Sequence, residues 1–185
     1  GYDVLLCDEN VDEFCMMAMQ DYTPKDAAEP DGSTKAWPIK NVGSEDLGLT
    51  TEEEKKKAEE ATEENADLFG AMQEALGGKV QKVVISTRVT DAPVVLTTEG
   101  AVSLQMANLL KEQPGADEGV PEAQIVMEVN AEHPVFQVLK AAHAAGDAQK
   151  VKDYAGILFD QALLVEGLPI ENPLEFSQRI SALMI

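Results

Sequence analysis

The chain has 185 residues and a hydrophobic content of 44%, which suffices for one good-sized folded domain or two small ones. Its 34 acidic residues outnumber its 14 basic residues, and the net charge of −20 opposes binding to phosphate backbones and anionic lipid surfaces. No apolar run approaches the roughly 20 residues that cross a bilayer, and the first residues carry no signal-peptide pattern. We therefore expect a folded protein that binds neither nucleic acid nor membranes, and the missing initial Met suggests a fragment of a longer chain.

The N-terminal stretch predicts a short strand and then a helix. Residues 3–7 are almost wholly apolar and bounded by charge, which favours a buried strand. The helix is indicated by apolar residues at helical spacing, namely Val11, Phe14, Cys15, Ala18 and Tyr22. Cys7 and Cys15 lack CxxC spacing, so we interpret them as buried, reduced thiols of a cytosolic protein rather than as a disulfide.

A loop and a polar helix come next in the chain. Residues 23–49 contain Pro and Gly at short intervals, which favours loop with at most one short strand near residues 37–42. Thr51 and Glu54 then form a capping-box pattern that begins a helix with a solvated first half. If this helix is continuous over residues 51–76, it is about 39 Å long at 1.5 Å per residue. We place a domain junction in it.

The junction divides the chain into residues 1–60, a small αβα unit with a linker helix, and residues 61–185, an α+β domain. In the second part, strands are indicated by β-branched runs at residues 80–86, 93–96 and 123–129. Apolar periodicity predicts helices at residues 134–145, 151–165 and 173–185. The expected fold is a small sheet backed by helices, ending in a helical hairpin.

A short helix with glycine-rich or polar flanks is predicted at residues 101–113. Its apolar residues at i, i+4, i+7 and i+8 line one face, namely Val102, Met106, Leu109 and Leu110. A helix on flexible connections that carries Met and Leu is suited to adapt to apolar segments of other proteins. From the residues alone, packing of this stripe on the sheet as core is an equally good interpretation.

The last two predicted helices are unusually apolar. The first is apolar over more than half its circumference. The second carries a stripe at i, i+4, i+7 and i+8, and Asn172 can cap its first free N–H groups. Such a hairpin favours a partner, most commonly a copy of itself, although both helices could instead cap their own core. We predict a dimeric four-helix bundle with interface residues Leu158, Phe159, Ala162, Leu163, Phe176, Ile180, Leu183 and Met184.

Few residues suggest catalysis. The sequence contains no phosphate-binding glycine motif, no nucleophile elbow and no HExxH. His133 precedes a Pro where a helix cap is expected, and His143 has no partner ligand at metal-binding spacing. The densest acidic cluster, Asp8, Glu9, Asp12 and Glu13, has the composition of a metal or acid–base site. Acids at the start of a helix are more often structural, so we expect no enzyme, no cofactor and no metal here.

Motifs along nearly the whole chain carry a resemblance to a known family. The segments 1–6 and 11–14 resemble the late middle domain of the ninety-kilodalton heat-shock chaperones. Further segments resemble that family's C-terminal domain in order, among them Lys82-Val83-Val84-Ile85-Ser86, Asp91-Ala92-Pro93, Gln105-Met106-Ala107, Glu128-Val129-Asn130, Leu158-Phe159-Asp160-Gln161-Ala162-Leu163-Leu164, Asn172-Pro173 and Arg179-Ile180.

The resemblance implies the dimerisation and client-binding portion of a homodimeric, ATP-dependent chaperone that assists protein folding under stress. The ATP and magnesium site would lie in an N-terminal domain outside this sequence. The resemblance also implies client contacts at Phe14 and Met17 and along the short helix predicted at residues 101–113, the tethered helix, at Met106, Leu109 and Leu110. We predict that these three residues and Val102 form a partly exposed stripe that binds unfolded segments of client proteins. Because the sequence ends without an acidic extension and EEVD, it looks similar to cytoplasmic bacterial members, which do not dock EEVD-dependent co-chaperones.

Two other classes of function stay open. One is a homodimeric interaction module without a chaperone role, which would show no preference for unfolded chains. The other is a metal-dependent enzyme that uses the carboxylates of residues 8–13. The sequence leaves the identity of the clients and the structure of residues 23–49 and 114–121 undetermined.

Overall fold

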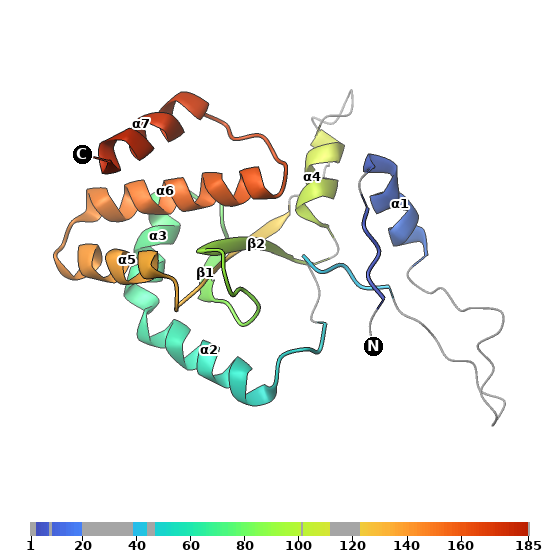
Figure 1. Ribbon diagram of the computed structural model, residues 1–185, viewed down its shortest axis with the longest axis horizontal. Helices are drawn as coiled ribbons and strands as arrows, with labels where there is room; N and C mark the ends of the chain where they lie inside the picture. The colour runs from blue at the N-terminus through green and yellow to red at the C-terminus, as the bar shows by residue number, and fades with distance from the viewer. Residues whose placement is uncertain are drawn as a thin grey trace.

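The computed structural model describes residues 3–7, 9–19, 39–43, 47–100, 102–111 and 123–184, and the chain is α+β as predicted (Figure 1). In this part of the chain, seven helices and three strands occur in the order α1 (Asn10–Ala18), α2 (Glu52–Glu64), α3 (Ala66–Ala75), β1 (Lys82–Ile85), β2 (Val94–Glu99), α4 (Leu104–Lys111), β3 (Gln124–Val129), α5 (Pro134–Ala144), α6 (Ala148–Val165) and α7 (Pro173–Leu183).

The sheet has the order β1-β3-β2, so the last strand in sequence lies in the middle. β1 runs parallel to β3, and β2 runs antiparallel to it. The register places Val83 and Leu96 on either side of Met127, and all three side chains are buried. Because side chains alternate along a strand, Glu128 lies on the opposite face from Met127.

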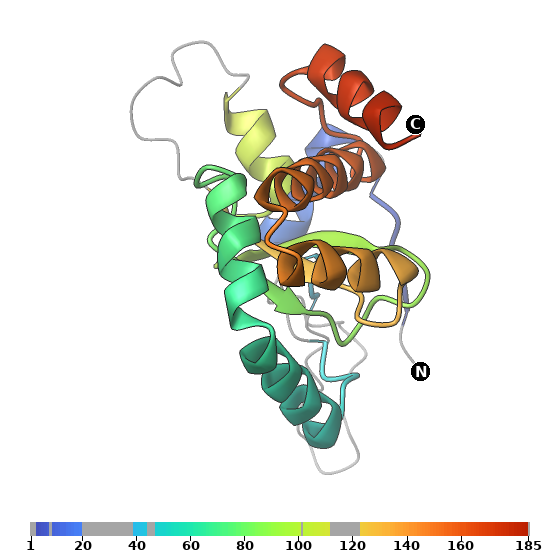
Figure 2. The same ribbon diagram turned by 90° about the vertical axis from the view of Figure 1, so that its left-hand side faces the viewer.

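The main core lies between one face of the sheet and the helices α3, α5 and α6 (Figures 1 and 2). α3 contacts β1, α5 and α6, and α6 also contacts β2. Met72, Met127, Leu139 and Ala155 are completely buried there, and burial of a side chain the size of Leu stabilises the fold by about 1.5–3 kcal/mol. α7, the last helix, packs on α6.

Three helix starts agree with the sequence-based capping predictions. The hydroxyl oxygen of Thr51 accepts from the Glu54 amide, and the Glu54 carboxylate accepts from the Thr51 amide at 2.8 Å. The ring of His133 accepts from the Val135 amide at 3.2 Å, which confirms its role as a cap. Asn172 likewise caps α7 through its side-chain oxygen.

The N-terminal strand prediction is wrong. Residues 3–7 form no strand, and Leu6 is 90% exposed. A strand needs a neighbour for its backbone hydrogen bonds, and the three strands of the described chain all come from residues 82–129. Cys7 and Cys15 are free thiols, as expected, but both are exposed rather than buried. The expected αβα unit therefore lacks its strand in the described residues.

The long helix predicted over residues 51–76 is divided at Asn65, which ends α2 and precedes α3. The side-chain amide of Asn65 donates to the Ala61 carbonyl at 2.7 Å, and the backbone at Asn65 leaves the helical conformation. Asn competes with helical hydrogen bonding in this way, which explains the break. The break lies close to the proposed junction at residue 60, and the division into two domains stays a prediction.

The loop predicted between α1 and α2 is only partly described. Residues 39–43 form no strand, so the short strand expected near residues 37–42 finds no support there. Residues 23–38 and the predicted loop at 114–121 lie outside the described residues. Among the helices that are described, none has the length and apolarity needed to cross a membrane.

Candidate functional site

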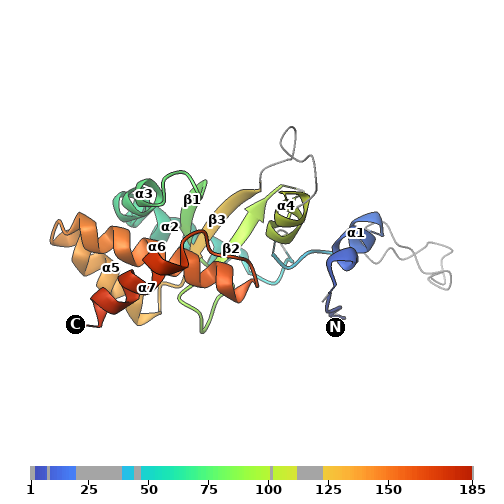
Figure 3. The ribbon, with the colours of Figure 1, turned by 90° about the horizontal axis from the view of Figure 1, so that it is seen from above.

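The C-terminal hairpin, α6 and α7, shows two different kinds of surface. The inner face of α6 belongs to the core of its own chain, with Val151, Ala155, Leu158, Phe159 and Ala162 all buried. α7 lies along the outer side of α6 and contains no buried residue (Figures 1 and 3). The hairpin therefore has an inner helix fixed by the core and an outer helix that rests mainly on it.

An ion pair joins the two helices of the hairpin. Arg179 Nη1 of α7 lies 3.6 Å from Asp160 Oδ2 of α6, and both side chains are mostly buried. Glu175, one turn earlier on α7, accepts a hydrogen bond from the same guanidinium. The Arg179 guanidinium lies directly against Gly156, where a Cβ would be 2.5 Å from Nη1. The absence of a side chain at Gly156 is what lets the guanidinium approach α6.

A second ion pair fixes the connection between the helices. Lys79, which precedes β1, donates to Glu171 at 2.7 Å, and its ammonium lies 5.6 Å from the centre of the Phe159 ring.

Burial raises the pKa of Asp160 above its usual value, while the charges of Lys79 and Arg179 oppose that shift. The negative charges of Glu171 and Glu175 add to the increase.

The hairpin exposes several large apolar side chains. We define the hairpin surface as the exposed large apolar residues at the end of α6 and along α7, which are Leu164, Val165, Leu174, Leu183 and Met184. The exposed fraction reaches 76% at Val165 and 82% at Met184. Leu163, Phe176 and Ile180 are half-buried beside them. A continuous patch of such side chains is typical of protein–protein contacts.

The residues predicted for a dimer interface therefore fall into two groups. Leu158, Phe159 and Ala162 are buried in the core of their own chain. Their assignment to a dimer interface is wrong, and the alternative that the helix covers its own core is correct for these three residues. The other five predicted residues lie on or beside the hairpin surface. The sequence analysis did not select Leu164, Val165 and Leu174 for the interface, although Leu164 and Val165 fall within its wide apolar face.

The predicted tethered helix differs from the expectation in its start and in its burial. Ser103 accepts from the Met106 amide at 3.0 Å, and α4 begins after this cap, so Val102 precedes the helix. Met106 is 3% exposed, and the prediction that it is exposed is wrong. Leu109 and Leu110 are half-buried. The buried residues of α4 are Leu104, Met106 and Ala107, and of these Leu104 belongs to the main core.

The structure brings the other predicted client residue close to this helix. Phe14 on α1 is 42% exposed, and α1 contacts α4. The side chain of Met17 lies outside the described residues. α4 is also joined to the end of α6, because the Gln105 amide donates to Glu166 at 2.9 Å. The candidate client residues and the hairpin are therefore connected through α4.

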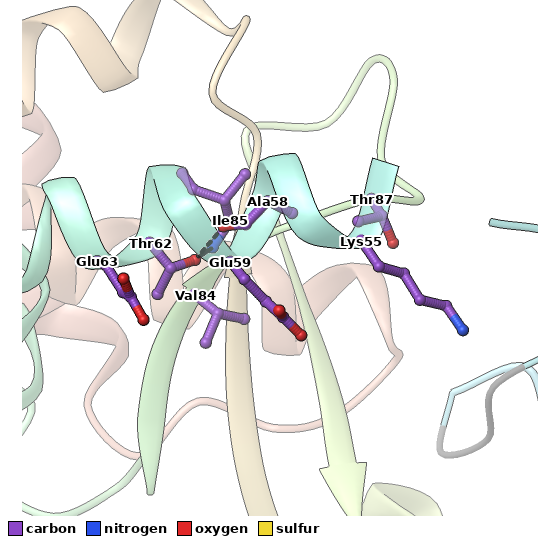
Figure 4. Close-up of a pocket in the computed structure, with 8 residues that line it drawn as sticks. All are labelled: Lys55, Ala58, Glu59, Thr62, Glu63, Val84, Ile85 and Thr87. Carbon is purple, nitrogen blue, oxygen red and sulfur yellow. Dashed lines mark hydrogen bonds between the residues drawn. The ribbon is translucent and has the colours of Figure 1, made fainter. Parts of the chain in front are cut away.

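A groove of about 380 Å³ lies between α2 and β1, lined by Lys55, Ala58, Glu59, Thr62, Glu63, Val84, Ile85 and Thr87 (Figure 4). The Thr62 hydroxyl accepts from the Ile85 amide at 3.0 Å, which ties α2 to β1. The charged groups of Lys55, Glu59 and Glu63 are spread along the helix and do not converge on one point in the groove (Figure 4). We assign it no chemistry.

The N-terminal acidic cluster serves a structural purpose in the residues that are described. The Asp12 carboxylate accepts from the Glu9 amide at 3.2 Å, as part of a capping box at the start of α1. Asp8 and the side chain of Glu13 lie outside the described residues. Within the described part of the chain, no three carboxylate, His or Cys side chains form a group that could hold a metal ion.

Comparison with known protein sequences shows the family of this chain. Residues 1–185 match the sequence model of the Hsp90 protein family from end to end. The chain belongs to the Hsp90 family. Similar relatives include the chaperone proteins HtpG of Clostridium perfringens strain 13, with 43% identity over 184 residues, and of Clostridium acetobutylicum, with 38% identity over 184 residues. The HtpG chaperone of Bacillus subtilis strain 168 is 37% identical over 185 residues.

The match covers all of this chain but only part of each relative. In the three HtpG proteins named, the aligned region is 27% of the relative's length. The chain thus spans about a quarter of the length of these Hsp90-family proteins, and the resemblance noted from its motifs is confirmed at the level of the family.

Proposed function

We propose that this chain is the dimerisation and client-binding portion of an ATP-dependent molecular chaperone that acts in the cytoplasm. Membership of the Hsp90 family and the chaperone names of its relatives support the general role. The observation that supports dimerisation is the hairpin surface, which is made of five large apolar side chains exposed on the last two helices.

The energetics favour burial of that surface. Each large apolar side chain that moves from water into a packed interface contributes about 1.5–3 kcal/mol before the costs of association are subtracted. A two-fold axis beside α7 would bring apolar residues of the hairpin surface against their copies in the partner chain. The resulting interface would be a four-helix bundle made of α6 and α7 from each chain.

The mass of the chain in solution tests this proposal. Light scattering on the unmodified chain at micromolar concentration should give twice the mass of one chain. Replacement of Leu183 and Met184 together by Ser should shift the mass towards a monomer without unfolding, because neither side chain belongs to the core. Leu49→Ser, at a position that is 62% exposed elsewhere, serves as the control and should stay dimeric. A monomer mass for the unmodified chain would refute the proposal.

The client-binding part of the proposal uses Phe14 and the accessible edges of Leu109 and Leu110. Phe14 is exposed on α1, and α1 contacts the helix that carries the two leucines. Phe14→Ser should weaken binding of a permanently unfolded model protein, measured by fluorescence anisotropy, and should leave the melting temperature unchanged. Unaltered affinity would instead support an interaction module that has no preference for unfolded chains.

We further propose that this portion holds no nucleotide and that ATP and magnesium belong to another part of the chaperone. The sequence has no phosphate-binding loop, and its net charge of −20 opposes a polyanion. Isothermal titration with ATP and magnesium should show no saturable heat at micromolar concentration. Saturable binding would contradict this part of the proposal and would reopen the question of an enzyme.

A further inference from the structure

A buried carboxylate lies on the face of the sheet opposite the main core. Glu128 is in the central strand β3, between Val84 of β1 and Val95 of β2, and its side chain is 9% exposed. Two hydroxyl groups donate to it, Ser86 at 2.7 Å and Thr97 at 3.1 Å. A charge in such a place is costly unless it is paired, and Arg88 Nη2 supplies the pairing at 3.3 Å from Oε1.

The same guanidinium reaches a second group, from a distant part of the chain. Arg88 Nη1 donates to the backbone carbonyl of Val42 at 3.0 Å. The next residue along the chain, Gly43, accepts a hydrogen bond from the Thr98 amide of β2 at 3.2 Å. The segment 39–43 is thus bound to the C-terminal sheet at two adjacent peptide groups, one through Arg88 and one directly along β2.

We infer that Arg88 is a latch that holds the segment 39–43 against the edge of β2, using Glu128 as its anchor. The anchor is rigid, because Met127 and Val129 on either side of Glu128 are completely buried in the main core. The position of residues 39–43, which precede α2, is then set by β2 and by Arg88 on its anchor in β3. This inference does not depend on dimerisation, since every residue involved belongs to one chain.

The two contacts of the latch use different nitrogens of one planar group. A guanidinium presents several donors in a fixed fork and can bridge two acceptors, whereas an ammonium is a single point charge. Arg88→Lys therefore keeps a positive charge near Glu128 but cannot reproduce the bridge to Val42. This substitution separates the latch from simple neutralisation of a buried charge.

The experiment measures amide hydrogen exchange by NMR on the whole chain. With Arg88→Lys, the Thr98 amide should exchange at least tenfold faster, because its acceptor Gly43 is no longer held in place. Amides of β3 and the melting temperature should stay as in the unmodified chain. Lys56→Met, which removes one charge from an exposed ion pair on α2, is the control and should alter neither quantity.

Two results would overturn the latch. One is an unchanged exchange rate of the Thr98 amide in Arg88→Lys, which would show that the bridge to Val42 does not hold residues 39–43 against β2. The other is an equal increase at Thr98 and throughout β3, which would make Arg88 a general stabiliser of the sheet. If the Lys variant does not fold, Glu128→Gln provides the same measurement, because it removes the charge that anchors Arg88 and keeps the shape of the side chain. Unchanged protection of Thr98 in Glu128→Gln would also overturn the latch.

Discussion

At the scale of single residues, Gly156 shows how a missing side chain can serve an ion pair. It lies within α6, where glycine is less favourable than alanine by about 0.5–1 kcal/mol. The cost has a structural reason, because a Cβ at this position would be 2.9 Å from Arg179 Cζ as well as close to Nη1. The space is occupied by the guanidinium that pairs with Asp160.

We predict that Gly156→Ala has opposite effects in two backgrounds. In a chain with Arg179→Ala, the substitution should stabilise the fold by about 0.5–1 kcal/mol, because the helix gains a better former and nothing is displaced. In the unmodified chain the gain should be cancelled, because Arg179 must move away from Asp160. Urea unfolding of the four variants at one protein concentration measures both effects. Equal changes in the two backgrounds would contradict the role given to Gly156.

Asp160 leads to a prediction about pH. Its pKa in the folded chain is raised, chiefly by burial, so the folded state binds the proton more tightly than the unfolded state. The contribution of Asp160 to the free energy of unfolding should therefore fall as the pH rises from the ordinary carboxyl pKa through the folded one. Urea unfolding between about pH 4 and pH 6 measures this. The free energy of unfolding of the unmodified chain minus that of Asp160→Asn should decrease as the pH rises.

The opposite slope would have a definite meaning. A difference that grows with pH would show that the attraction of Lys79 and Arg179 outweighs the burial of the carboxylate. The ion pair would then stabilise the hairpin at neutral pH instead of only orienting α7.

At the scale of elements, α4 is the helix whose interpretation changed most. We predict that Met106→Ser lowers the free energy of unfolding by about 2–4 kcal/mol, because it removes a buried apolar side chain and buries a hydroxyl. Leu110→Ser, at a half-buried position on the same helix, is the control and should cost clearly less. Thermal unfolding of both variants measures the difference. Equal small effects would show that Met106 is accessible in solution.

Sequence patterns predicted the elements that depend on local chemistry. The caps at Thr51, His133 and Asn172 use side chains within three residues of the groups they satisfy, so their spacing is visible in the sequence. The β-branched runs gave the three strands to within a few residues. The helical periodicity of residues 134–165 gave two helices, although three of the residues that it assigned to a dimer interface are buried in the core of their own chain.

Features that depend on distant partners were not predictable in the same way. An apolar run such as residues 3–7 fits a strand, but whether another strand lies beside it is decided by the fold. The width of the apolar face on α6 gave no indication that β2, α3 and α5 cover its inner half. The pairs Arg179–Asp160 and Arg88–Glu128 join residues far apart in sequence, and no spacing pattern in the sequence indicates that these residues meet.

At the scale of the whole molecule, charge and apolar surface act against each other. Each chain carries a net charge of −20, so two chains repel one another while the hairpin surface favours their association. We predict that the proposed dimer becomes several-fold tighter between about 50 and 500 mM NaCl, because the Debye length shortens from roughly 14 Å to roughly 4 Å. Sedimentation velocity over a dilution series measures this. Weaker association at high salt would indicate an interface held by ion pairs.

The order of the strands has a consequence for the synthesis of the chain. β1 and β2 are made first, yet among the described strands each pairs with β3 alone, which is translated later and must enter between them. During translation β1 and β2 therefore lack the strand that supplies their hydrogen-bonding partners, and α6, which packs on β2, comes later still. A pause after β1 and β2 have left the ribosome, but before β3 has, would expose the unpaired strand edges that promote aggregation. This member of a chaperone family thus passes, while it is made, through the kind of state that chaperones protect.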